Sequence, residues 1–201
     1  HVYQAVQALS PDGVFFVVSH QSDQIKKLFC SNDQIVFVEQ GEPLGTGHAV
    51  QVTSGVVQKP KNSLTIVLSG DTPLITANTL RQLIAEHQEK KAAVTVLTTT
   101  LQNPTGYGRI LRNEFGQISG IVEEKDCSID EKKITEINSG VYAFDTRELF
   151  NQIFNLKSEN TQNEFYLTDT VRFIFESQQT VATCYCEDAT ETYGVNSRQD
   201  L

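Results

Sequence analysis

The sequence has no long hydrophobic run and little positive charge. No apolar stretch approaches the roughly 18 to 20 residues that a transmembrane helix needs, and no signal-peptide pattern opens the chain. Lysine and arginine number 16 against 25 aspartates and glutamates, which gives a formal net charge of −9. We therefore expect neither a nucleic acid nor an anionic membrane as a partner. An anionic nucleotide would need a divalent cation or a local basic cluster in order to bind.

Methionine is absent altogether, and the chain begins at His1. These two features indicate a fragment of a longer protein. Cysteine is scarce, and the spacing of Cys30, Cys127, Cys184 and Cys186 matches no zinc-binding pattern. Cys184 and Cys186 would share one face of a strand. We therefore expect the cysteines to be packing residues of a reduced, cytoplasmic protein rather than metal ligands.

What the sequence does contain is a regular alternation of helix and strand signals. Apolar residues recur at helical spacing over 1–9 and 23–30, and short apolar runs over 14–19 and 35–38 predict strands. This order predicts a layered α/β sheet. The 201 residues suit one domain with a sizeable core, and no internal repeat, low-complexity tract or clear linker divides them.

The stretch 64–74, LTIVLSGDTPL, places a carboxylate directly after a strand. Residues 64–69 predict a buried strand that stops at Gly70, and Asp71 follows at once. An open α/β sheet binds its ligands outside the carboxyl ends of its strands, so Asp71 is the first candidate for a ligand contact. The alternative is that Asp71 only opens a turn or caps the helix that begins near Thr76.

A glycine-punctuated loop spans 40–50 and leads into a predicted helix over 47–54. Its sequence, QGEPLGTGHAV, would let backbone N–H groups approach a ligand closely. The loop matches neither a Walker motif nor G-x-G-x-x-G, which disfavours a dinucleotide-binding oxidoreductase and leaves ligand contact as one interpretation among others. His48 lies in the first turn of that helix, where a surface or capping role is more common than acid–base chemistry.

The second half of the chain changes to a β-rich pattern. A tight loop over 103–110 precedes a predicted hairpin whose strands span 107–111 and 117–124. The second strand ends in an acidic pair that begins at Glu123. Taken alone, this pair indicates an exposed strand end rather than a binding site.

The strand expected at 134–145 carries an unusual interruption. Asn138, Ser139 and Gly140 are poor strand formers, and such a local inconsistency is typical of a bulge or a ligand-facing position. The remaining elements are expected as helices over 76–90, 146–156 and 168–175 and as strands over 93–101 and 181–186.

Seven motifs, taken in their order and spacing, resemble one enzyme family over essentially the whole chain. They are QGEPLGTGHAV, SGDTPLI, NPTGYGRI, GIVEEKD, EINSGVYAF, NEFYLTD and GVNSRQDL. The family is the N-terminal uridyltransferase domain of the bifunctional N-acetylglucosamine-1-phosphate uridyltransferase/glucosamine-1-phosphate acetyltransferase. Single motifs of this kind recur across sugar nucleotidyltransferases, whereas seven in register are specific.

The resemblance implies an α/β fold: a Rossmann-like nucleotidyltransferase three-layer sandwich with a mixed, mostly parallel central sheet and a β-rich sugar-binding lobe. Residues 1–101 would form the nucleotide-binding part of one partial nucleotidyltransferase domain. Residues 102–201 would form the sugar-binding part and a closing metal-ligand segment.

The resemblance also implies a reaction, in which UMP passes from UTP to N-acetylglucosamine 1-phosphate during the synthesis of peptidoglycan or lipopolysaccharide precursors. The sugar phosphate would attack the α-phosphorus in line, so no protein nucleophile is needed. Mg²⁺ would be the cofactor, and it prefers a few protein oxygens completed by phosphate and water. The implied contacts are Gln40, Gly45 and Thr46 at the uracil; Ser69, Gly70 and Asp71 at the ribose and phosphates; Gly108, Glu123 and Asn138 at the sugar; and Asp71 and Asn196 at the metal.

Two departures from the family limit this expectation. The family's opening strand and glycine-rich phosphate loop, with a basic residue and a following lysine, are missing, because His1 already matches the helix after them. The C-terminal β-helix that carries the acetyltransferase and holds full-length relatives as homotrimers is also missing. We therefore expect little or no uridyltransferase activity from these 201 residues alone.

Two alternative functions stay open, and Ser69 departs from the family pattern. Ser69 stands where many relatives carry a larger residue, which leaves base or ribose contacts there undecided. The chain is alternatively a nucleotidyltransferase for another sugar 1-phosphate or base, or a non-catalytic nucleotide-sugar-binding domain. Glu123 and Asn138 favour the N-acetylhexosamine.

Overall fold

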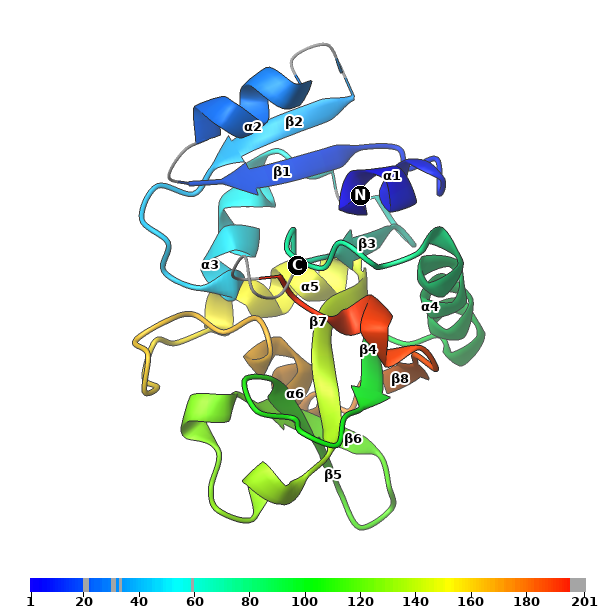
Figure 1. Ribbon diagram of the computed structural model, residues 1–201, viewed down its shortest axis with the longest axis vertical. Helices are drawn as coiled ribbons and strands as arrows, with labels where there is room; N and C mark the ends of the chain where they lie inside the picture. The colour runs from blue at the N-terminus through cyan, green and yellow to red at the C-terminus, as the bar shows by residue number, and fades with distance from the viewer. Residues whose placement is uncertain (20–21, 30–31, 33, 59, 196–201) are drawn as a thin grey trace.

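The structure is a computed structural model that describes residues 1–19, 22–29, 32, 34–58 and 60–195. Figure 1 shows its helices packed around two β-sheets. The α-helices are α1 (Val2–Gln7), α2 (Ser22–Phe29), α3 (Thr46–Gln51), α4 (Ala77–Lys90), α5 (Thr146–Gln152) and α6 (Asp169–Glu176). The strands are β1 (Val14–Val18), β2 (Ile35–Glu39), β3 (Leu64–Val67), β4 (Val94–Thr100), β5 (Gly108–Arg112), β6 (Ile118–Val122), β7 (Glu136–Asp145) and β8 (Val181–Tyr185). The short 3₁₀ helices are η1 (Val52–Gly55), η2 (Glu124–Asp126), η3 (Glu131–Lys133), η4 (Ile153–Asn155) and η5 (Ala189–Thr192).

The larger sheet has six strands in the order β6-β5-β7-β4-β8, with β3 also paired to β7. It is mixed, as predicted. The expected predominance of parallel pairs is wrong, because β4–β8 is parallel whereas β3, β4 and β5 all pair antiparallel with β7 and β5 pairs antiparallel with β6. An apolar run predicts a strand without indicating its direction. Here the chain returns through the β5–β6 hairpin, so that β7 enters the sheet reversed.

Helices cover both faces of this sheet, which confirms the three-layer α/β architecture (Figure 1). Helix α4 presents Leu80 and Leu83 to one face, where Ala5 of α1 joins the same apolar cluster. Helices α5 and α6 cover the other face, with Leu149 and Ile174 fully buried. The apolar residues of α4 recur at helical spacing, which is why a single face of this helix is buried.

The smaller sheet consists of β1 and β2 in parallel, with Val14 opposite Ile35. Its apolar contacts are aromatic: Phe16 packs edge-to-face against Tyr3, Phe29 and Phe37, with ring centroids 5.0 to 5.8 Å apart. Helices α1 and α2 thereby attach to this sheet, and the helix–strand alternation expected for the first forty residues is confirmed.

Strand β3 differs from its expectation in both length and burial. It ends at Val67 rather than at residue 69, and each of its four residues is only half-buried. Within the described part of the chain, β3 pairs on one side alone, with β7. A strand at the edge of a sheet keeps part of its surface exposed, which accounts for the difference.

Of the helices in the described ranges, even the longest, α4, has 14 residues, and none combines the length and apolar character required to cross a bilayer.

Candidate functional site

Strand β3 ends and strand β5 begins along the same edge of β7, and most of the predicted site lies between these two points. Strand β3 ends with Val67 opposite Tyr142, and β5 begins with Gly108 opposite Asn138. Strand β4 pairs with β7 along both of these halves and so occupies the opposite edge. The carboxyl end of β3 therefore faces the start of β5 across residues 139–141.

A bulge lies at this junction, which is one of the two alternatives that the interruption of strand propensity indicated. Gly140 has a φ of +78°, and the register of the β4–β7 pair shifts between Val96 and Thr98. A Cβ added to Gly140 would lie 3.2 Å from the Ser69 hydroxyl oxygen. The positive φ favours glycine here, and the turn after β3 packs directly against it.

Asp71 lies exposed in the turn that follows β3. Its carbonyl oxygen accepts a hydrogen bond of 2.8 Å from the Val195 N–H, so the end of the described chain returns to this turn. The capping alternative for Asp71 is wrong, because the Thr76 side chain caps α4 by accepting from the Thr79 N–H at 3.2 Å. Asn196, the second predicted metal ligand, lies outside the described residues.

A metal centre made wholly of protein ligands is not present in the described part of the chain. No group of three or more His, Cys, Asp and Glu side chains there could hold a metal ion. Mg²⁺ does not require such a group when phosphates supply most of its ligands, since one or two carboxylates then suffice. The exposed Asp71 carboxylate at the end of β3 fits that use.

Gly108, Glu123 and Asn138, all predicted at the sugar, lie together. A Cβ added to Gly108 would lie 3.3 Å from Glu123 Oε2 and 3.5 Å from the Asn138 Cβ, so the three residues pack closely against one another. The Asn138 amide is buried; its Nδ2 donates to the Tyr142 hydroxyl at 2.7 Å and its Oδ1 accepts from the Gly140 N–H at 3.1 Å. These bonds fix the orientation of the amide.

The Glu123 carboxylate is held by a hydrogen bond, and its pKa is shifted. Its Oε1 accepts a hydrogen bond of 2.9 Å from the Thr168 hydroxyl. Burial, together with the nearby carboxylates of Asp126, Asp169 and Glu164, raises the pKa of Glu123 above its ordinary value, although the Thr168 bond acts in the opposite direction. The expectation of an exposed acidic strand end is wrong for Glu123, which is half-buried.

The glycine-rich loop docks on the segment that precedes α6. Gly45 has a φ of +107°, and a Cβ there would lie 2.7 Å from the Phe165 carbonyl oxygen. The Gly47 N–H donates to that carbonyl at 2.7 Å, and the Leu167 N–H donates to the Thr46 hydroxyl at 3.1 Å. Both glycines are therefore required by close backbone approach.

Gln40 closes the same loop from the end of β2. Its Nε2 lies 3.1 Å from the Gly45 carbonyl oxygen and 3.3 Å from His48 Nδ1. The half-buried His48 lies in the first turn of α3, as expected, and contacts Gln40, a predicted base-binding residue. Its non-catalytic role stays a prediction.

These contacts form a continuous path, which we call the contact path, between elements far apart in the sequence. It runs from Gln40 and Gly45 through Thr46 and Leu167 to Thr168, Glu123, Gly108, Asn138, Gly140 and Ser69, with Gly70 and Asp71 next in the chain. All the predicted site residues except Asn196 lie on it or directly beside it.

Two residues at this site had no predicted role. Thr168 belongs to the NEFYLTD motif, and a hydroxyl directly before α6 was the available signal. Arg109 belongs to NPTGYGRI, and the sequence carried no signal of its role, because its burial within β5 is visible only in the structure. Two cavities of about 200 and 260 Å³ are found elsewhere, and none of the predicted site residues lines them.

The sequence matches the family model described as Nucleotidyl transferase over residues 3–190, and the chain belongs to this family. More particularly, it is 40% identical over 201 residues to the Bifunctional protein GlmU of Syntrophomonas wolfei subsp. wolfei and 42% identical over 201 residues to that of Limosilactobacillus fermentum. These matches confirm the resemblance found in the motifs. Both cover 100% of this chain and 44% of the relative, so the chain spans less than half the length of the curated relatives it matches.

Solved structures agree on the fold. UDP-glucose pyrophosphorylase complexed with UDP-glucose superposes with a TM-score of 0.65 at 14% identity, covering 90% of this chain and 76% of that one. HddC from Yersinia pseudotuberculosis gives a TM-score of 0.62 at 15% identity, covering 91% and 73%. At these identities the likeness concerns the fold alone.

Proposed function

We propose that this chain transfers UMP from UTP to N-acetylglucosamine 1-phosphate, giving UDP-N-acetylglucosamine and pyrophosphate for peptidoglycan or lipopolysaccharide precursors. The observation that carries the proposal is the contact path, which joins residues from six separate motifs into one continuous set of contacts. Identity of about 40% to GlmU relatives over the whole chain supports it.

The nucleotide would lie along the first half of the path. Gln40 and the Gly45–Thr46 peptide would read the uracil edge; because the Thr46 hydroxyl already accepts from Leu167, its backbone is the group that we assign to the base. Ser69 and Gly70 would follow the ribose and phosphates, and an added Cβ on Gly70 meets no atom within 4 Å. Residues 1–101 would thus serve the nucleotide.

The sugar phosphate would lie along the second half. The Glu123 carboxylate would accept hydrogen bonds from sugar hydroxyls through Oε2, since Thr168 occupies Oε1. The Gly108 N–H and the fixed Asn138 amide would complete the sugar contacts. Residues 102–201 would thus serve the acceptor.

The Asp71 carboxylate, together with Asn196, would hold Mg²⁺ against the phosphates. When bound, Mg²⁺ supplies positive charge that offsets the negative charge of the triphosphate. The protein then acts by positioning: an oxygen of the sugar phosphate attacks the α-phosphorus in line as the bond to the bridging oxygen breaks and pyrophosphate leaves with that oxygen. No side chain of the described site needs to form a covalent intermediate.

We place the protein in the cytoplasm. The described cysteines, Cys127, Cys184 and Cys186, are free thiols, which suits a reducing compartment. Homotrimers formed through a C-terminal β-helix belong to the proposal for the whole protein that contains this chain.

The test uses the natural protein that contains this chain, mixed with UTP, N-acetylglucosamine 1-phosphate and Mg²⁺, and follows pyrophosphate release. Absence of release would overturn the proposal, and a panel with glucose 1-phosphate and a thymidine nucleotide fixes the specificity. Binding of UDP-N-acetylglucosamine without turnover would instead indicate a non-catalytic domain.

Asp71→Asn tests the metal assignment in the same assay. We expect kcat to fall by about 100-fold or more, because charge compensation at the phosphates is lost. The melting temperature should hardly change, since the carboxylate is exposed. Asp130→Asn, which removes the charge of a side chain that is 90% exposed at the edge of η3, is the matched control and should leave kcat unchanged. Unchanged turnover in Asp71→Asn would remove this residue from the metal site.

A further inference from the structure

The largest fully buried side chain in the described structure carries a positive charge. Arg109, in β5, is 1% exposed, and its neighbour Ile110 is 2% exposed. Removing a guanidinium from water costs several kcal/mol unless its donors are satisfied, and apolar residues of similar volume often serve stability as well or better. Stability alone therefore gives little reason for an arginine at this position.

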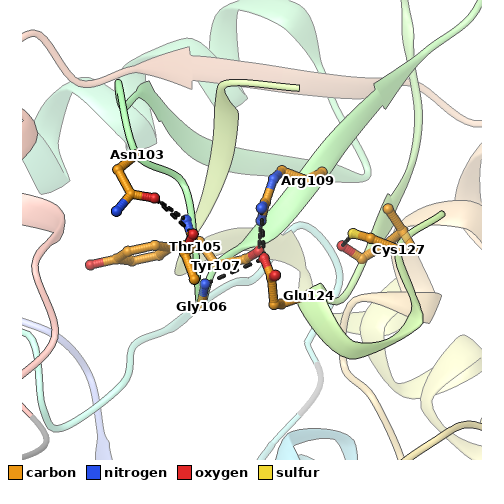
Figure 2. Close-up of polar contacts among 8 residues, drawn as sticks. Asn103, Thr105, Gly106, Tyr107, Arg109, Glu124 and Cys127 are labelled. Atoms are coloured by element: carbon orange, nitrogen blue, oxygen red, sulfur yellow. Dashed lines mark hydrogen bonds and ion pairs between the residues drawn. The ribbon is translucent and has the colours of Figure 1, made fainter. Parts of the chain in front are cut away.

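The Arg109 guanidinium bonds both to the loop before β5 and to η2 (Figure 2). Its Nη2 donates to Glu124 Oε2 at 2.6 Å, and its Nη1 donates to the Tyr107 carbonyl oxygen. The same Glu124 oxygen accepts from the Gly106 N–H at 3.3 Å. Although burial alone would raise it, the pKa of the Glu124 carboxyl is lowered by these bonds from Arg109 and Gly106, so this carboxylate stays ionised at neutral pH.

Both members of this pair are direct sequence neighbours of sugar-site residues. Arg109 follows Gly108, and Glu124 follows Glu123. The bonds to Gly106 and Tyr107 fix the loop on the other side of Gly108. The pair thus holds the backbone around Gly108 against the strand end that carries the Glu123 carboxylate.

We propose that Arg109 and Glu124 are positioning residues for the acceptor sugar phosphate. Their ion pair sets the distance between the Gly108 N–H and the Glu123 carboxylate, so that one sugar contacts both. The inference rests on the proposed function and deepens it, because neither side chain is assigned to substrate. The planar fork of arginine suits this task, since one guanidinium reaches a carboxylate and a carbonyl at fixed angles.

A second arginine–glutamate pair on the same strand provides a matched control. Arg112 donates to Glu136 at 2.8 and 2.6 Å and contacts the Gly116 carbonyl of the hairpin turn at 2.9 Å. The Glu136 side chain is 23% exposed, compared with 26% for Glu124. The two glutamates thus match in exposure and in partner. Their arginines differ in position along β5, since Arg109 follows Gly108 directly whereas Arg112 lies at the other end of the strand.

The experiment measures KM for UTP and for N-acetylglucosamine 1-phosphate separately in the natural protein and in its variants. We expect Glu124→Gln to raise KM for the sugar phosphate about fivefold and Arg109→Met about thirtyfold, with KM for UTP unchanged, because misplaced binding groups lose contact with the sugar alone. Arg109→Lys should stay impaired, since one ammonium cannot reproduce the fork. Glu136→Gln should leave both KM values unchanged even where it lowers the melting temperature.

The outcomes separate this inference from the proposed function. If the unmodified protein releases no pyrophosphate and binds no sugar phosphate by calorimetry, the proposed function fails. If it is active but Glu124→Gln and Arg109→Met leave KM for the sugar phosphate unchanged, or raise both KM values equally, the pair is merely structural and the inference is overturned. Full activity of Arg109→Lys would also overturn it, because charge alone would then suffice.

Discussion

The β1–β2 sheet and the six-stranded sheet differ in how completely they are packed. Six of the seven residues of β4 are buried, whereas β1 and β2 bury one residue each, Val18 and Ile35. The eight residues of α2, all of them described, include no buried one. The first sheet therefore depends on a small aromatic cluster, and the second on two apolar layers.

This difference in packing shows that the position of the glycine-rich loop is fixed by the six-stranded sheet rather than by the β1–β2 sheet from which the loop leaves. The loop leaves β2, in the weakly packed region, yet its glycines dock on Phe165, which packs against the core of the six-stranded sheet. Helix α1 provides a second connection, since Tyr3 packs against Phe16 while Ala5 joins the α4 side of the larger core. The well-packed sheet thus sets the geometry of the candidate nucleotide site, and the small sheet is positioned through its contacts with that sheet.

The largest expected effect compares the two cores directly. Phe144→Ala, at a side chain that is 0% exposed, should lower the free energy of unfolding by about 4 kcal/mol, and the half-buried Phe16→Ala by about 2 kcal/mol. The reason is that the cavity and the lost transfer energy are both greater where packing is complete. Urea unfolding followed by circular dichroism measures both values. Equal losses would contradict the difference between the two sheets.

A smaller effect is expected at the contact between the regions. In Gly47→Ala the added Cβ would lie 2.3 Å from Leu156 Cδ1 and 2.8 Å from the Phe165 carbonyl oxygen. We expect a loss of about 1–3 kcal/mol in unfolding free energy and a raised KM for UTP, because the loop must move away from Phe165. Gly55→Ala, where a Cβ meets nothing within 4 Å, is the control and should change neither quantity. If Gly47→Ala binds UTP normally, the contact of the loop with Phe165 does not determine the geometry of the nucleotide site.

The smallest effect concerns pH and the Glu123 carboxylate. Because its pKa is raised in the folded state, the folded chain prefers the neutral form, and stability falls as the pH rises through the ordinary value of 4.5 and then the raised folded value. Glu123→Gln stays neutral, so its melting temperature should exceed that of the parent by a few degrees at most near pH 7 and equal it below about pH 4. The same variant should bind the sugar phosphate more weakly. A lower melting temperature at pH 7 would contradict the raised pKa.

Local patterns in the sequence were enough to place most helices and strands and the bulge at Gly140. They did not predict that β7 would run antiparallel to β3, since strand pairing depends on contacts remote in sequence. The burial of Arg109 was equally inaccessible, because a charged residue in a strand pattern is ordinarily assigned to the solvent face. The motifs predicted the grouping of Gly108, Glu123 and Asn138, although the Thr168 bond that orients Glu123 became visible only in three dimensions.

Strand β7 sets the separation between the two halves of the candidate site. Its residues from Asn138 to Tyr142 separate the start of β5 from the end of β3. One continuous stretch of backbone therefore determines how far the candidate sugar contacts lie from the candidate phosphate contacts. A one-residue insertion there would turn every later side chain of the strand to the opposite face. The register that packs the core therefore also fixes the separation between the two halves of the candidate site.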